Sequence, residues 1–137
     1  MATTYLCGGI FGLDDAQAID WRELAKQELK TETLDPMRRD YRGKQDDHVD
    51  KIVEQDLEDI KKSDFLIVNA TIPSWGTAME IPYAYAMGKK VVAFTGEGRV
   101  SPWLRYHCNG GIVRTIEEAI VLINQGVEEK EKDFVLE

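Results

Sequence analysis

The chain has 137 residues, of which 43% are hydrophobic and 31% are charged, and its formal net charge is -8. This size predicts one domain with a single core, and the acidic balance argues against a DNA or RNA polymer as partner, because phosphate backbones are bound by clustered lysine and arginine side chains. The sequence has neither an apolar run of the roughly 20 residues that a membrane span needs nor a basic and apolar leader, so we expect a cytoplasmic protein that does not bind membranes.

Strands and helices are predicted to alternate along the chain. A first strand at 3–7 is followed by a glycine-rich turn and by a helix to about residue 30, with Asp14 or Asp15 as its cap. The later elements are a weak strand at 31–34, a polar loop to about 47, a helix at 48–62, a buried strand at 64–70, a loop and helix, a buried strand at 89–94, a loop at 95–110, a short strand at 112–113, a helix at 115–125 and a peripheral tail at 126–137. This alternation predicts a single α/β domain over residues 1–137, with a doubly wound parallel sheet of five strands.

Three loops leave the carboxyl ends of the predicted strands, where ligands bind in doubly wound sheets: residues 8–12, 71–77 and 95–105. Gly8, Gly9 and Gly12 lack the spacing of the dinucleotide-binding motif, and the chain has no P-loop motif. The sequence therefore indicates neither NAD nor ATP, and we expect no cofactor. The glycines suit a tight turn and a ligand-cradling loop equally well.

Metal and disulfide sites are not indicated. His48 and His107 have no carboxylate or cysteine at the spacing of metal ligands. Cys7 and Cys108 are too few for a disulfide scaffold, so reduced thiols are expected, although the sequence leaves a single bridge open. A small anion is compatible with the acidic chain, because residues 37–42 contain three arginines.

Asp56 lies on an apolar stripe of the helix predicted at 48–62. The apolar members of the stripe are Val49, Ile52, Val53 and Ile60. The same spacing predicts that Glu54, Glu58 and Asp59 point elsewhere. A carboxylate that faces a core needs hydrogen-bond donors or becomes protonated. Asp56 is therefore either a structural residue bonded to a nearby loop or a functional one.

Glu80 has two structural interpretations. Thr77 and Glu80 match a capping box, in which the glutamate would only begin a helix. Pro82 opposes a regular helix from Thr77, because its ring would clash with the carbonyl of Ala78. The helix must therefore kink or begin near Pro82, and the second case would release Glu80 toward the ligand end of the sheet.

Three segments stand out as an ordered set. They are Tyr5-Leu6-Cys7-Gly8-Gly9-Ile10-Phe11, Asp56-Leu57 ahead of the strand at 65–69, and Pro73-Ser74-x-Gly76-Thr77-x-x-Glu80-Ile81. This set resembles the nucleoside 2-deoxyribosyltransferase family over residues 5–107, and its Gly-Thr-x-x-Glu element is the most specific part. The resemblance implies a flavodoxin-like fold and an enzyme that exchanges the base of a 2'-deoxyribonucleoside by a retaining double displacement.

The resemblance also implies roles for single residues. Glu80 matches the family's nucleophile, which attacks the anomeric carbon and forms a glycosyl-enzyme. Tyr5 matches a tyrosine that orients the nucleophile, and Asp56 matches an aspartate that helps to protonate the departing base. The implied substrate contacts are Cys7, Gly8, Ile10, Phe11, Asp40, Arg42, Ser74, Gly76 and Ser101.

Two serines leave the substrate open. Typical transferases of the family hold the sugar 5'-hydroxyl with an acidic residue six positions before the nucleophile, where this chain has Ser74. A serine there resembles the related 2'-deoxynucleoside 5'-monophosphate N-glycosidases, in which hydroxyls receive the 5'-phosphate. Ser101 lies in the loop that reaches the neighbouring subunit's site in the family, which implies a homo-oligomer. Pro82 replaces the family's usual glycine.

We favour base exchange between nucleosides, with a nucleoside or nucleotide and a free nucleobase as partners. The alternative is an N-glycosidase that hydrolyses nucleoside 5'-monophosphates to free base and sugar 5-phosphate. A nucleotide-sensing protein without turnover is a third interpretation of the same sheet.

Overall fold

The computed structural model describes residues 1–136, with the side chains of residues 1–132. Five parallel strands form one sheet in the order β2-β1-β3-β4-β5. They are β1 (Thr3–Gly8), β2 (Glu32–Leu34), β3 (Phe65–Asn69), β4 (Lys90–Phe94) and β5 (Gly111–Val113). This strand order is that of a flavodoxin-like sheet, and it confirms the predicted single-domain α/β fold.

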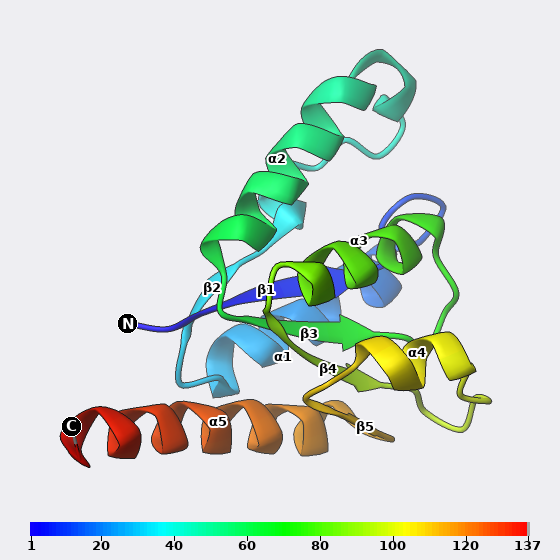
Figure 1. Ribbon diagram of the computed structural model, residues 1–137. Coiled ribbons are helices and arrows are strands. Elements are labelled where there is room, and N and C mark those ends of the chain that lie inside the picture. Colours follow the sequence, from blue (N-terminus) through cyan, green and yellow to red (C-terminus); the bar gives the residue numbers. More distant parts are fainter. Residues whose placement is uncertain (137) are drawn as a thin grey trace.

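Helices cover both faces of the sheet, with α2, α3 and α4 on one face and α1 and α5 on the other (Figure 1). The helical elements are η1 (Ala16–Asp20), α1 (Trp21–Glu28), η2 (Pro36–Arg38), η3 (Gln45–Asp47), α2 (Val49–Lys62), α3 (Trp75–Ala86), α4 (Pro102–His107) and α5 (Ile116–Leu136). No helix of the described residues combines the length and the apolar character that crossing a membrane requires. Both cysteines are buried and free.

The central strands have the continuous apolar sequences expected of a sheet that is covered on both faces. Tyr5 and Cys7 of β1 pack into the core on the side of α2, α3 and α4. Leu6 packs into a second core with α1 and α5, because successive strand residues face opposite sides. β1 thus contributes to both cores, and its pairing with β2 and β3 places it inside the sheet.

The carboxyl-terminal third differs from the prediction in two places. The loop expected at 95–110 contains the short helix α4, in which the Ser101 hydroxyl accepts a hydrogen bond from the Trp103 amide at 3.1 Å. The helix expected to end at 125 continues to Leu136, so the predicted tail at 126–137 is helical as far as it is described, and residue 137 lies outside the described residues. Gly126 permits this continuation, because a Cβ there would lie 3.1 Å from the ring of Phe65.

α2 is oriented differently from the prediction. Its amino-terminal half extends beyond the sheet (Figure 1), so Val49 and Val53 of the predicted core stripe are 57% and 50% exposed. Ile60 is fully buried, whereas Asp59, which was expected to point elsewhere, is only 5% exposed. That expectation was wrong because two arginines of a distant loop fold against Asp59, as described below.

α3 begins at Ser74, whose hydroxyl accepts a hydrogen bond from the Thr77 amide at 3.4 Å. The predicted capping box of Thr77 and Glu80 is therefore wrong, and Glu80 lies inside the helix. The helix also continues through Pro82, so a start near Pro82 is wrong as well. Pro82 has no amide to donate to the carbonyl of Ala78. Because Pro82 is exposed, water can bond that carbonyl instead.

Candidate active site

Glu80 is held by two side chains of β1. The hydroxyl of Tyr5 donates a hydrogen bond to Oε2, and the Cys7 Sγ lies 3.8 Å from Oε1 as a weak donor. Tyr5 and Cys7 are two residues apart on one strand, so both face α3. Both are fully buried. The orientation of the carboxyl group is therefore fixed by the protein core.

The surroundings of Glu80 change its proton affinity. Burial raises the pKa of Glu80 to about 7, the hydrogen bond from Tyr5 opposes this effect, and the charge of Asp56 adds to it. Burial and the nearby Glu80 also raise the pKa of Tyr5 well above its usual value. Tyr5 thus remains a hydrogen-bond donor, and Glu80 is divided between its protonated and ionised forms near neutral pH.

A cavity of about 650 Å³ lies at the carboxyl end of β1. The turn after β1, the side of α2 and the start of α3 form its walls, and Glu80 and Asp56 are its acidic members. The predicted contact residues that line it are Gly8, Ile10, Phe11, Ser74 and Gly76. Most of the remaining lining is apolar, which suits a ligand with a flat, weakly polar ring.

Gly8 allows the turn after β1 to pack closely. A Cβ at this position would lie 2.7 Å from Cζ2 of Trp21 and 3.2 Å from Cβ of Asn69. Gly12, at the end of the same turn, has a φ of 79°, which favours glycine. The glycines therefore make the turn, and Gly8 also forms part of the cavity wall.

Asp56 reaches the cavity from α2. Burial raises the pKa of Asp56 to about 6, and the charge of Arg39, whose Nη2 lies 3.3 Å from Oδ1, opposes this effect. Glu80 and Asp56 are therefore two acids of similar strength in one cavity. Between about pH 6 and pH 7 the two carboxyl groups together hold one proton. Each of the two titration steps therefore describes the pair and not one residue alone.

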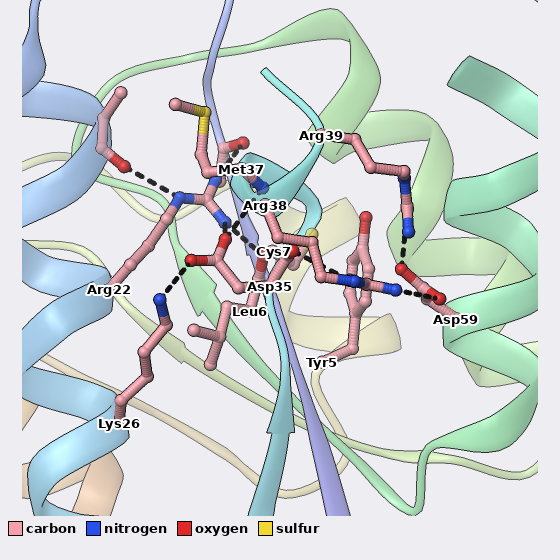
Figure 2. A network of polar contacts seen from close by, with 12 residues as sticks. Tyr5, Leu6, Cys7, Arg22, Lys26, Asp35, Met37, Arg38, Arg39 and Asp59 are labelled. Carbon is pink, nitrogen blue, oxygen red and sulfur yellow. Dashed lines mark hydrogen bonds and ion pairs between the residues drawn. The ribbon is translucent and has the colours of Figure 1, made fainter. Parts of the chain in front are cut away.

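Arg22 lies fully buried beneath the end of β1 (Figure 2). Its Nη1 donates to the carbonyl of Leu6 at 2.6 Å, and its Nη2 donates to the carbonyl of Gly8 at 3.0 Å. Asp35 lies 3.4 Å from Nη1 and balances the charge. Arg22 thus fixes the backbone on both sides of Cys7, and with it the strand that holds Glu80.

The prediction from sequence missed Arg22. Its position, four residues after Ala18 and three before Ala25, is on the buried side of the helix. An arginine among small buried residues was therefore the available signal, and it indicates a charge with dedicated partners in the core.

A second cavity of about 620 Å³ lies on the other side of the loop before α3. Ile72, Ser74 and Thr77 line both cavities. Ser101, a predicted substrate contact, lines the second cavity together with Arg99. Ser74 therefore stands between the space beside Glu80 and the space beside Ser101.

Three predicted contacts lie outside both cavities. Cys7 is fully buried and touches the Glu80 carboxyl group. Asp40 and Arg42 bind each other, with 2.9 Å between Oδ2 and Nη2, and Arg42 is held further by Asp15 at 2.7 Å. The loop folds these two side chains onto each other, so each charge has a partner of opposite sign within the loop.

The chemistry of the site depends on its two carboxyl groups. Within the part of the chain that the structure describes, no three His, Cys, Asp or Glu side chains come together as metal ligands. One half-buried carboxylate held by a tyrosine can act as a nucleophile, and a second carboxyl group with a raised pKa can carry a proton. This arrangement suits displacement at a sugar carbon.

The family model for nucleoside 2-deoxyribosyltransferase matches residues 4–134. No curated protein matches the chain. A conserved protein from Enterococcus faecalis V583 has a similar structure, with a TM-score of 0.76 and 22% identity over 91% of this chain and 98% of that one.

Two structures with named activities also have this fold. The 2-desoxiribosyltransferase from Leishmania mexicana has a TM-score of 0.68 and 18% identity, over 91% of this chain and 98% of that one. The CMP N-glycosidase from Clostridium botulinum has a TM-score of 0.56 and 22% identity, over 86% of this chain and 95% of that one. At these identities the structures show a shared fold.

Proposed function

The chain belongs to the nucleoside 2-deoxyribosyltransferase family, and on that premise we propose that it exchanges the base of 2'-deoxyribonucleosides through a covalent glycosyl-Glu80 intermediate. The main support is the carboxyl group of Glu80, which Tyr5 holds at the wall of a cavity that also contains Asp56. Gly8, Ile10, Phe11, Ser74 and Gly76 are the proposed contacts for sugar and base.

In the first step the Glu80 carboxylate forms a bond to the anomeric carbon, and the bond from that carbon to the base nitrogen breaks. The electron pair of the broken bond goes to the base, which takes the proton of Asp56. In the second step a nitrogen of the incoming base bonds to the same carbon, Glu80 leaves as a carboxylate, and Asp56 takes the proton that the incoming base loses. Two displacements at one carbon retain its configuration.

The test is incubation with a deoxynucleoside and a different free base, followed by product analysis. We expect the exchanged nucleoside, its loss in Glu80→Ala, and covalent labelling of Glu80 by a 2-fluoro sugar donor. Glu58→Gln, at an exposed side chain of α2, is the matched control and should exchange bases like the parent. Release of free sugar alone would exclude a transferase, and turnover without labelling of Glu80 would exclude the covalent route.

The alternative is hydrolysis of nucleoside 5'-monophosphates to free base and sugar 5-phosphate. It is supported by the second cavity, where Ser74, Ser101 and Arg99 offer two hydroxyls and a cation beside the first cavity. With a nucleotide donor this function predicts sugar 5-phosphate, and Ser74→Asp should weaken it by placing a carboxylate near the phosphate. A clear preference for unphosphorylated donors would count against it. A sensing role would leave all donors intact and Glu80 unlabelled.

We also infer a homo-oligomer in which the Ser101 loop lies near a neighbouring site. α3 carries exposed apolar side chains beside the first cavity: Trp75, Met79 and Tyr83 are 88%, 72% and 38% exposed. Helices that are apolar on all sides are usually covered by another surface. Sedimentation should give at least twice the chain mass of 15.6 kDa, and Trp75→Glu should reduce it, whereas Val121→Glu on α5 should not. A monomer at every concentration would exclude the oligomer.

A further inference from the structure

We propose that Arg39 and Asp59 are positioning residues that set how readily Asp56 holds the proton for the departing base. The inference rests on the proposed function for its chemical meaning, but its geometry stands by itself. A chain of alternating charges ends at the cavity and runs in the order Arg38, Asp59, Arg39 and Asp56.

Arg39 is shared unequally between two carboxyl groups. Its Nη2 lies 2.7 Å from Oδ2 of Asp59 and 3.3 Å from Oδ1 of Asp56. Asp56 and Asp59 are three residues apart on α2, so a single guanidinium group can reach both. The shorter contact goes to the residue outside the cavity, and Asp56 receives the weaker one.

Both carboxylate oxygens of Asp59 are bonded to arginines. Arg38 Nη2 lies 2.8 Å from its Oδ1, so each carboxylate oxygen has one guanidinium partner (Figure 2). Arg38 is itself held, because its Nη1 donates to the carbonyl of Asp35 at 2.8 Å. Burial opposes ionisation of Asp59, but the hydrogen bonds from Arg38 and Arg39 lower its pKa below the usual value. Asp59 therefore carries a permanent negative charge near neutral pH.

The permanent charge on Asp59 has two effects on Asp56. It balances part of the charge of Arg39, and it repels a second negative charge on the same side of α2. An unshared Arg39 would form an ordinary ion pair with Asp56 and keep it ionised. With Asp59 present, Asp56 can bind a proton near neutral pH although an arginine touches it.

Other groups also face Asp56. Arg22 from α1 favours its ionised form. The negative charge of Asp56 in turn raises the pKa values of Tyr5 and Cys7 on β1 and of Glu80 on α3. These groups stay in place when Arg39 or Asp59 is changed, so the two changes isolate the arginine–aspartate chain.

The experiment is a carbon-13 NMR titration of the aspartate carboxyl groups in the full chain, with Asp56→Asn identifying the signal of Asp56. Asp59→Asn should lower the pKa of Asp56 by about one pH unit, because Arg39 is released to it and a negative neighbour is lost. Arg39→Gln should raise the pKa of Asp56 by a similar amount, because its cationic partner is lost. The matched control is Glu58→Gln, which removes one exposed negative charge of α2 and should leave Asp56 unchanged.

Opposite shifts in the two variants would support the proposal, and a fold defect would not produce them. Shifts in the same direction, or no shift in either folded variant, would overturn it even if the parent protein exchanges bases. Above the pH optimum the rate of base exchange should follow the protonated fraction of Asp56, so that Asp59→Asn loses about tenfold in rate there. Failure of the parent to exchange bases would reject the proposed function and leave the titration result standing.

Discussion

Replacing Tyr5 by phenylalanine removes one oxygen atom and leaves the buried ring in place. The lost hydroxyl is the donor to Oε2 of Glu80. A hydrogen bond to a charged group contributes about 1.5–3 kcal/mol, and here it favours the ionised carboxylate. Its loss should therefore raise the pKa of Glu80, already about 7, by about one to two pH units.

The expected loss of activity follows from the ionised fraction of Glu80. At pH 7 the parent has about half of Glu80 ionised, and the variant should have roughly 5- to 50-fold less. The parent's rate should be bell-shaped with limbs near pH 6 and pH 7, because the active form combines an ionised Glu80 with a protonated Asp56, whereas both groups are protonated below this range and both are ionised above it. In Tyr5→Phe the alkaline limb, which Glu80 sets as the weaker acid, should move to higher pH, and the maximum should fall.

The assay is the rate of base exchange between pH 5 and pH 9, with thermal unfolding of each variant as a check on folding. Tyr41→Phe is the matched control, since it removes a hydroxyl that donates to Gln55 at 3.1 Å, away from both cavities. The control should keep the parent profile. An alkaline limb of Tyr5→Phe at the parent's pH, in a folded protein, would refute the claim that this hydrogen bond sets the protonation of Glu80.

Two further predictions concern stability, measured by urea unfolding. Arg22→Met should cost about 3–5 kcal/mol, because it leaves the buried carbonyls of Leu6 and Gly8 without their donor; a cost below about 1 kcal/mol would show that water replaces the guanidinium. Gly8→Ala should cost about 1–3 kcal/mol, because its Cβ would meet the Trp21 ring at 2.7 Å. Gly76→Ala, where the added Cβ meets nothing within 4 Å, should unfold like the parent, and equal costs at both glycines would contradict the packing explanation.

The sheet could be predicted from the sequence because its signals are local. β3 and β4 are short apolar runs between polar segments, and strands that alternate with helices favour one topology. The helix α4 was missed because its six residues are too few to show a helical period. The extension of α5 was missed because Gly126 suggests an end, whereas the close approach of the Phe65 ring favours a glycine there.

The site depends on contacts that sequence spacing does not encode. Tyr5 and Glu80, which meet in the core, are 75 residues apart in the chain, and only the resemblance linked them. Asp59 follows Arg38 by 21 residues and Arg39 by 20, so its burial depends on how the intervening loop folds. Charged residues on a helix are expected in solvent unless such partners arrive from elsewhere.

The position of β1 inside the sheet has a consequence for how the cavity moves. Opening β1 requires separation from both β2 and β3, so the amide protons of Tyr5 to Cys7 should exchange with solvent only when the whole domain unfolds. The amino-terminal half of α2 lies outside the sheet (Figure 1), and its amides should exchange through local opening. The cavity wall at β1 is then rigid, whereas the wall formed by α2 can move. In the proposed reaction, bases of different size could therefore enter while the carboxyl group of Glu80 keeps its place.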